Sequence, residues 1–254
     1  MPRGYVIYDG PSMLDGSRIV AIATLHSTNR KTGNMVQTWI MRADMDPIAA
    51  NRWGFDISVC GRCQSMGKAR PLTDTSGLAL NRACYVDLGR APMGIWNAWA
   101  NGMYPAAIGH KAIAAIGRGR KYRRTVRLGA YGDPAAVPGH VWESLISEAA
   151  GHTAYSHQRD WSGAAFDPAI MMVSADTLAG AEEAWSAGAR TFRVVGQVSE
   201  LVRGREILCP ASEEAGKRTQ CASCLLCAGA GKRAKSIAIV VHGAGRKHHS
   251  AAAA

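Results

Sequence analysis

The chain has 254 residues, of which 47% are apolar and 19% charged, so it can bury a sizeable core in one large domain. This composition excludes a disordered chain and a fibrous repeat. Thirty Lys and Arg residues against 19 Asp and Glu residues give a formal net charge of +11, which favours contact with polyanions. No segment reaches the ~18 consecutive apolar residues that a membrane span needs. We therefore expect a soluble, cytoplasmic protein without membrane contact.

The first 104 residues predict a layer of short strands. Three apolar runs separated by polar turns are the candidate strands, at residues 5–8, 18–25 and 35–42. Further along, Ile95, Trp96 and Trp99 are spaced as on one face of a helix. We expect these three side chains to pack in the core rather than to bind a ligand.

From about residue 105 the pattern changes to apolar runs that alternate with helix-like segments. The candidate strands are residues 125–131, 153–155, 169–173, 191–195 and 236–241, and the candidate helices are residues 141–150 and 178–187. This alternation is typical of βα units. We predict one α/β domain: a βα-repeat parallel sheet or partial TIM-like barrel (105–245), joined to the N-terminal β layer (1–104) and followed by a disordered tail (246–254).

Four of the candidate strands end on polar residues, Asp133, His157, Asp176 and His242. Because the carboxyl ends of parallel strands form one face, these side chains are expected to converge there. Asp133, His157 and Asp176 are our candidates for orienting a substrate or moving a proton. The alternative for the two aspartates is ordinary capping, because Asp133 precedes a proline and Asp176 precedes a helix-like segment.

The seven cysteines fall into two sets, which favours metal binding in a reducing compartment over a disulfide framework. The C-terminal set is Cys221-x2-Cys224-x2-Cys227 with a separate Cys209-Pro210. Three thiolates at this spacing can reach separate corners of a cubane, and a remote cysteine can supply the fourth corner. The set predicts a [4Fe-4S] cluster, with a zinc ion as the alternative.

The N-terminal set, Cys60, Cys63 and Cys84, has only three thiolates. It lies in about 25 residues rich in Gly, Ser, Thr and Arg, which need something other than a core to order them, and a bound metal would do so. Either one iron of a second cluster stays open to a small-molecule ligand, or a histidine completes the set. The candidate histidines are His26, His110, His152 and His157. A zinc knuckle without a catalytic role is the plainer alternative.

The order of the motifs resembles a bacteriophage protein family related to the gene product 88 proteins. The motifs that carry the resemblance span about residues 27–243: Asn29-x-Lys31-Thr32-Gly33-x-Met35, Cys60-x2-Cys63, Cys84-Tyr85-Val86, Val126-Arg127-Leu128, Gly132-Asp133, Ala154-Tyr155-Ser156 and the C-terminal cysteines. The resemblance implies a phage-encoded iron–sulfur protein in the cytoplasm of the infected host. It also implies a βα core similar to the partial barrel of radical S-adenosylmethionine enzymes, and no particular reaction. This chain departs from the family at Pro134, where an aromatic residue is usual.

Residues 117–127 place six cations close together. Arg118, Arg120, Lys121, Arg123 and Arg124 are the candidates for contact with nucleic-acid phosphates, and Tyr122 is available to stack on a base. The alternative is a solvated loop that precedes a strand.

Three classes of function follow from these patterns. The first is a redox or radical enzyme, although the radical-enzyme arrangement of three cysteines at x3 and x2 spacing is absent. The second is a nucleic-acid-binding phage factor stabilised by a cluster or by zinc, and the third is a structural zinc protein. A nucleotide hydrolase or serine hydrolase is disfavoured, because the sequence has neither a phosphate-binding loop nor a nucleophile elbow.

Overall fold

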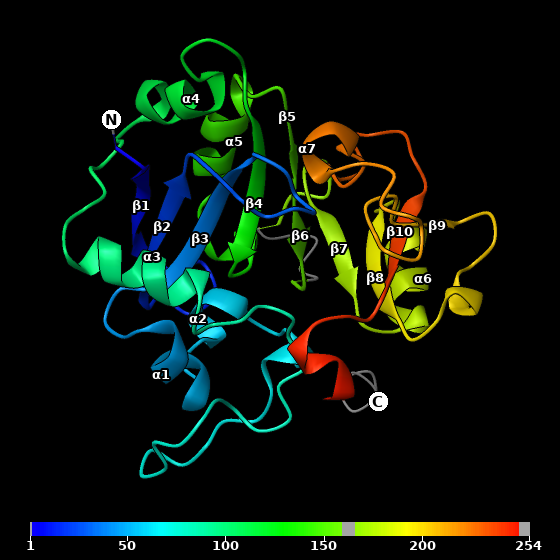
Figure 1. The fold of residues 1–254 in the computed structure, drawn as a ribbon, viewed down its shortest axis with the longest axis horizontal. Coiled ribbons are helices and arrows are strands. Elements are labelled where there is room, and N and C mark those ends of the chain that lie inside the picture. The colour runs from blue at the N-terminus through cyan, green and yellow to red at the C-terminus, as the bar shows by residue number, and fades with distance from the viewer. Residues whose placement is uncertain (1, 159–165, 249–254) are drawn as a thin grey trace.

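Two five-stranded sheets that meet at Ala154 form the framework of the protein (Figure 1). The computed structural model describes residues 2–158 and 166–248, so residues 249–254 of the predicted tail lie outside the described residues. Ala154 is fully buried, its N–H donates to the carbonyl of Cys227, and its carbonyl accepts from the N–H of Met172. The strand before Ala154 belongs to one sheet and the strand after it to the other.

The first sheet has the strand order β1-β2-β3-β4-β5. Its strands are β1 (Gly4–Pro11), β2 (Arg18–Thr24), β3 (Val36–Arg42), β4 (Thr125–Tyr131) and β5 (Gly151–Thr153). The first three strands are antiparallel, and β3, β4 and β5 are parallel. The N-terminal strands are therefore not a separate layer, because β3 pairs directly with β4 of the βα region.

The second sheet is entirely parallel and has the order β6-β7-β8-β10-β9. Its strands are β6 (Tyr155–Ser156), β7 (Met172–Ala175), β8 (Thr191–Val195), β9 (Glu206–Leu208) and β10 (Ser236–Val240). The α/β class is thus confirmed. The candidate strand at 169–173 was placed too early, the one at 153–155 spans the junction of the sheets, and β9 was not predicted.

The helices cover the sheets and carry part of the cysteine framework. They are α1 (Pro47–Arg52), α2 (Ile57–Cys60), α3 (Ala91–Ala100), α4 (His110–Arg118), α5 (Gly139–Ser147), α6 (Leu178–Ser186) and α7 (Cys221–Cys224). Ile95, Trp96 and Trp99 of α3 pack against the main core, which confirms their predicted packing role. No helix among residues 2–158 and 166–248 is long and apolar enough to cross a membrane.

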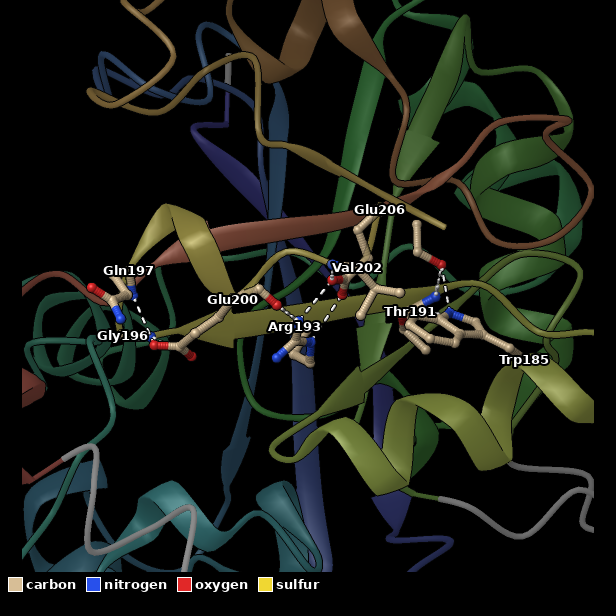
Figure 2. A network of polar contacts seen from close by, with 9 residues as sticks. Trp185, Thr191, Arg193, Gly196, Gln197, Glu200, Val202 and Glu206 are labelled. Atoms are coloured by element: carbon tan, nitrogen blue, oxygen red, sulfur yellow. Dashed lines mark hydrogen bonds and ion pairs between the residues drawn. The ribbon is translucent and has the colours of Figure 1, made fainter. Parts of the chain in front are cut away.

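A buried ion pair connects β8 to β9, the edge strand of the second sheet (Figure 2). Arg193 of β8 donates from Nε and Nη2 to the two carboxylate oxygens of Glu206 in β9, at 2.9 and 2.7 Å. The same guanidinium donates to the carbonyl of Glu200, and Glu206 also accepts from the N–H of Val202. Since β10 lies between β8 and β9, this network joins the two strands that flank it.

Candidate functional site

All seven cysteines line one cavity of about 470 Å³. Strand residues two apart point to the same face, so alternate residues of the parallel strands form its wall. The wall residues are Arg127, Gly129 and Tyr131 of β4, Tyr155 of β6 with His157 just after that strand, Ser174 of β7 with Asp176 just after that strand, Phe192 and Val194 of β8, and Ile237 and Ile239 of β10. Helices α2 and α7, which carry cysteines of the two sets, lie toward opposite ends of the strands (Figure 1).

The N-terminal cysteine group consists of Cys60, Cys63 and Cys84. Cys60 ends the short helix α2, and the N–H of Cys63 bonds back to the carbonyl of Cys60. Cys84 is brought alongside by a hydrogen bond from its N–H to the carbonyl of Ser65. The predicted irregular stretch between Cys63 and Cys84 is thus folded back so that its two ends meet at the cavity.

His157 is the histidine that lies beside this group. Its Nε2 is 3.7 Å from Sγ of Cys63 and 3.4 Å from Oδ1 of Asp176. Burial alone would lower the pKa of His157, but the charge of Cys63 and the hydrogen bond to Asp176 outweigh it and raise this pKa well above the ordinary value. The imidazole of His157 therefore lies between the sulfur of Cys63 and the carboxylate of Asp176, at the carboxyl ends of β6 and β7.

The predicted convergence of the strand-end residues occurs. Asp133 accepts a hydrogen bond from the N–H of His157 at 2.7 Å, and Asp176 contacts the ring of the same histidine. His242 lines the same cavity and stacks against Tyr85, with 6.0 Å between ring centroids. Asp133 holds its neighbours rather than facing the cavity freely, because its second oxygen caps the N–H of Ala135.

The other three candidate histidines lie elsewhere. His110 contacts the hydroxyl of Ser144 at 2.9 Å, and Nε2 of His152 contacts the carbonyl of Ile170 at 2.9 Å. His110, His152 and His26 do not line the cavity that the cysteines line. Among the four histidines considered from the sequence, the geometry thus selects His157.

The C-terminal cysteine group consists of Cys209, Cys221, Cys224 and Cys227. Helix α7 is a single turn that brings Cys221 and Cys224 together, and it ends at Leu225, which has a positive φ of 51°. Cys209 follows β9 and is fixed by a hydrogen bond from its N–H to the carbonyl of Ala238. Cys209 and Cys227 are buried, whereas Cys221 and Cys224 are half-buried at the cavity wall.

The loop between β2 and β3 supports α7, which explains the Asn29 to Gly33 motif. The N–H groups of Cys221 and Ala222 donate to the carbonyls of Lys31 and Thr32. Asn29 shapes the loop by accepting from the N–H of Lys31 at 2.9 Å. The motif therefore provides acceptors for the otherwise unpaired N–H donors at the start of the helix.

Burial raises the pKa of several cysteine thiols in the two groups. Loss of water is the main cause for Cys60, Cys84, Cys221 and Cys227, and it raises the pKa of Cys227 to about 12. A bound metal reverses this effect, since it supplies the positive charge that stabilises a thiolate. Within the described part of the chain, no three His, Cys, Asp or Glu side chains are arranged to hold a single metal ion.

Two cations near the C-terminal cysteine group, Lys31 and Arg127, were not predicted to lie at the cysteine site, and Arg127 was considered for a site only as part of the basic stretch 118–127. Lys31 lines the cavity, where burial lowers the pKa of its amine although Cys209 and Cys221 act to raise it. Arg127 lines the cavity too and donates from Nη2 to the hydroxyl of Tyr85 at 2.6 Å. The sequence signal for Arg127 was its position between the apolar residues Val126 and Leu128. In a strand with this alternation, the charged side chain lies on the opposite face from its apolar neighbours.

The remaining basic residues of 117–127 make several contacts with neighbouring elements. Arg123 donates to the carbonyl of Glu148 just after α5, and Arg124 donates to the carbonyl of Leu25. Arg118 is 3.7 Å from Glu148, and Lys121 lies over the ring of Tyr122. These contacts bind the segment to α5 and β2, so nucleic-acid binding by Arg118, Arg120, Lys121, Arg123 and Arg124 stays a prediction.

Comparisons with family models, with curated proteins and with solved structures found no match to this chain.

Proposed function

We propose that the protein is an iron–sulfur enzyme. In this proposal Cys209, Cys221, Cys224 and Cys227 bind a [4Fe-4S] cluster, and Cys60, Cys63 and Cys84 bind a second metal centre. The observation that carries the proposal is that all seven cysteines line a single cavity of about 470 Å³. A structural metal site has no need of such a cavity, whereas an enzyme needs one to admit a substrate.

The donor set of the C-terminal cysteine group favours a cluster over zinc. A structural zinc ion needs four ligands that meet tetrahedrally at one point. The ligands of a cubane bind separate iron atoms at its corners, so they need not meet. Three cysteines come from α7 and the residues directly after it, and the fourth comes from the end of β9, which suits this wider spacing.

The N-terminal cysteine group supports a second centre that a substrate can reach. His157 is placed to act as its fourth ligand or to hold a proton beside an iron that remains open. Asp176 holds the ring from one side, and Asp133 fixes the backbone N–H of the same residue. Both aspartates are therefore positioning residues in this proposal.

A [4Fe-4S] cluster supplies one-electron transfer, and an iron with an open position also binds a small molecule directly. The chain itself contributes three functions around that chemistry. The strands β8 and β10 exclude water with apolar side chains, Lys31 places a positive charge beside the C-terminal thiolates, and His157 holds a proton. These are the properties of a redox or radical enzyme site.

The arrangement of the strands supports the same proposal. Residues from parallel strands of both sheets, which join at Ala154, line the cavity, and this supports a partial TIM-like barrel of the radical S-adenosylmethionine type as our proposal. We further propose that the protein belongs to the bacteriophage family that its motifs resemble, and that it acts in the reducing cytoplasm of the infected host.

The proposal is tested by loading two cysteine variants with iron and sulfide under anaerobic conditions. Cys224→Ser removes a ligand of the first centre, and Cys84→Ser removes a ligand of the second. We expect each variant to lose a different part of the iron and of the visible absorption of the wild type. Ser223→Ala is the matched control, because this exposed residue lies in α7 between two cysteines and should leave the metal content unchanged.

Zinc binding without uptake of iron or sulfide by the wild type would contradict the proposal. So would equal and complete retention of iron in the two cysteine variants, since the thiolates would then not be the ligands.

A further inference from the structure

The guanidinium of Arg127 has a hydrogen-bond donor that the described residues leave unused. Its Nε atom is buried and has no hydrogen-bond partner among them, although the side chain lines the cavity. Nη2 is fixed by the hydroxyl of Tyr85, the residue that follows Cys84. A buried N–H without a partner costs free energy, so a ligand that accepts from it would be stabilised.

The acidic side chains that line the cavity already have other partners. Asp56 accepts from the amide of Asn51 at 2.8 Å, Asp133 accepts from backbone N–H groups, and Asp176 contacts His157. Lys31 and Arg127 both lie near Cys221, and Arg127 turns its Nη2 toward Tyr85. Since none of these acidic side chains of the described residues accepts from Arg127, its buried Nε–H remains available to an anion in the cavity.

The wall of the same cavity on the second sheet is apolar. Phe192 and Val194 of β8 and Ile237 and Ile239 of β10 line it. Phe192 packs against Tyr155 with 4.5 Å between ring centroids, and Tyr155 is also an electrostatic neighbour of Arg127. A ligand that fills the cavity therefore meets a cation at one end and apolar surface along its length.

We infer that the cavity binds a small organic carboxylate, whose anionic end lies on Arg127 and Tyr85 and whose apolar body lies on β8 and β10. A guanidinium presents parallel N–H donors that match the two oxygens of a carboxylate. The inference rests on the proposed function, because it names the substrate class for the cavity of that enzyme.

Isothermal titration with three acids and their neutral amides tests this inference. The probes are phenylacetate, benzoate and hexanoate, each compared with its amide, on metal-loaded and metal-free wild-type protein. At least one acid should bind saturably, and its amide should bind about 10-fold more weakly or worse, because a charge-assisted pair contributes roughly 1.5–3 kcal/mol.

Two variants locate the anionic end. Arg127→Gln should weaken binding of the acid by about 10- to 100-fold and leave binding of the amide nearly unchanged. Tyr85→Phe should weaken it by a smaller factor, because the hydroxyl that orients the guanidinium is lost. Arg123→Gln is the control, since this arginine of the same basic segment contacts α5 instead of the cavity. If Arg127→Gln does not fold, Tyr85→Phe and the comparison of acid with amide still decide the question.

Equal binding of acids and amides, unchanged affinity in a folded Arg127→Gln variant, or no saturable binding of any of the three acids would overturn the inference. Metal analysis of the same samples separates the two proposals. A protein that binds the acid but takes up no iron contradicts the proposed function alone, and an iron-loaded protein that binds none of the acids contradicts the carboxylate site alone.

Discussion

The carboxylate of Asp133 accepts three hydrogen bonds, from the N–H groups of Ala135 and His157 and from the side-chain amide of Gln158. At the scale of a single residue, this aspartate joins the end of β4 to the end of β6. We expect Asp133→Ala to lower the free energy of unfolding by about 2–4 kcal/mol, because it leaves these donors without an acceptor.

Chemical denaturation of the metal-free protein measures this effect. Asp9→Ala is the control, because Asp9 forms an exposed pair with Arg18 and such pairs contribute little. A variant at Asp133 that is as stable as the control would show that these three hydrogen bonds are not important for folding.

His152 predicts a dependence of stability on pH. Burial lowers its pKa below 6.5, and this outweighs the opposing hydrogen bond to the carbonyl of Ile170. The unfolded chain then binds the proton more readily than the folded chain, so stability is lost as the pH falls below 6.5. We expect the free energy of unfolding to fall more steeply between pH 6.5 and 5 in the wild type than in His152→Gln. Parallel pH profiles of the two proteins would refute this.

At the scale of an element, the loop between β2 and β3 decides whether α7 is in place. Gly33 has a φ of 71°, and a Cβ at this position would lie 3.2 Å from Cβ of Ala222 in α7 and 2.8 Å from Oε1 of Gln220, the residue before α7. Gln220 itself donates to the carbonyl of Arg30. We expect Gly33→Ala to push the loop and α7 apart and to reduce the iron retained by the C-terminal cysteine group.

Gly16→Ala separates this effect from backbone strain. Gly16 has a φ of 78°, but a Cβ there meets nothing within 4 Å. Both variants should lose stability, by about 1 kcal/mol or more for the strained φ. Only Gly33→Ala should lose iron, as measured by metal analysis after a chelator challenge. Equal iron retention in the two variants would mean that the loop does not position α7.

The second sheet depends on the ion pair between Arg193 and Glu206 (Figure 2). Both side chains are buried, at 6% and 0% exposure, so removing one charge leaves the other without compensation. We expect Glu206→Gln to lower the free energy of unfolding by about 3–5 kcal/mol. Glu213→Gln removes one partner of an exposed pair with Lys217 and should change stability little. A Glu206→Gln protein as stable as this control would contradict the structural role of the pair.

At the scale of the whole molecule, the sequence predicted the long apolar strands and the meeting of their polar ends. β4 and β8 were predicted with their observed bounds, because apolar and β-branched residues dominate both segments although each contains one arginine. β9 has three residues and was missed, since its formation depends on pairing with β10 and on the buried Glu206. Short elements of this kind are determined by tertiary contacts, which a local pattern does not contain.

The residues of the candidate site were predictable from the sequence, but their geometry was not. The spacing of the cysteines identified the two groups, and the strand ends identified His157 and Asp176. The sequence alone did not show that both groups line one cavity, nor that Arg127 turns into it while Arg123 contacts α5. Those facts depend on which face of β4 is turned inward, and the pairing of β3 with β4 decides this.

The most direct test of the central claim is the iron, sulfide and zinc content of the wild-type protein purified without oxygen, together with its visible absorption. We expect a brown protein with at least about four irons and four sulfides per chain, and more iron than this when the N-terminal cysteine group is also filled. Stoichiometric zinc with neither iron nor sulfide would contradict it.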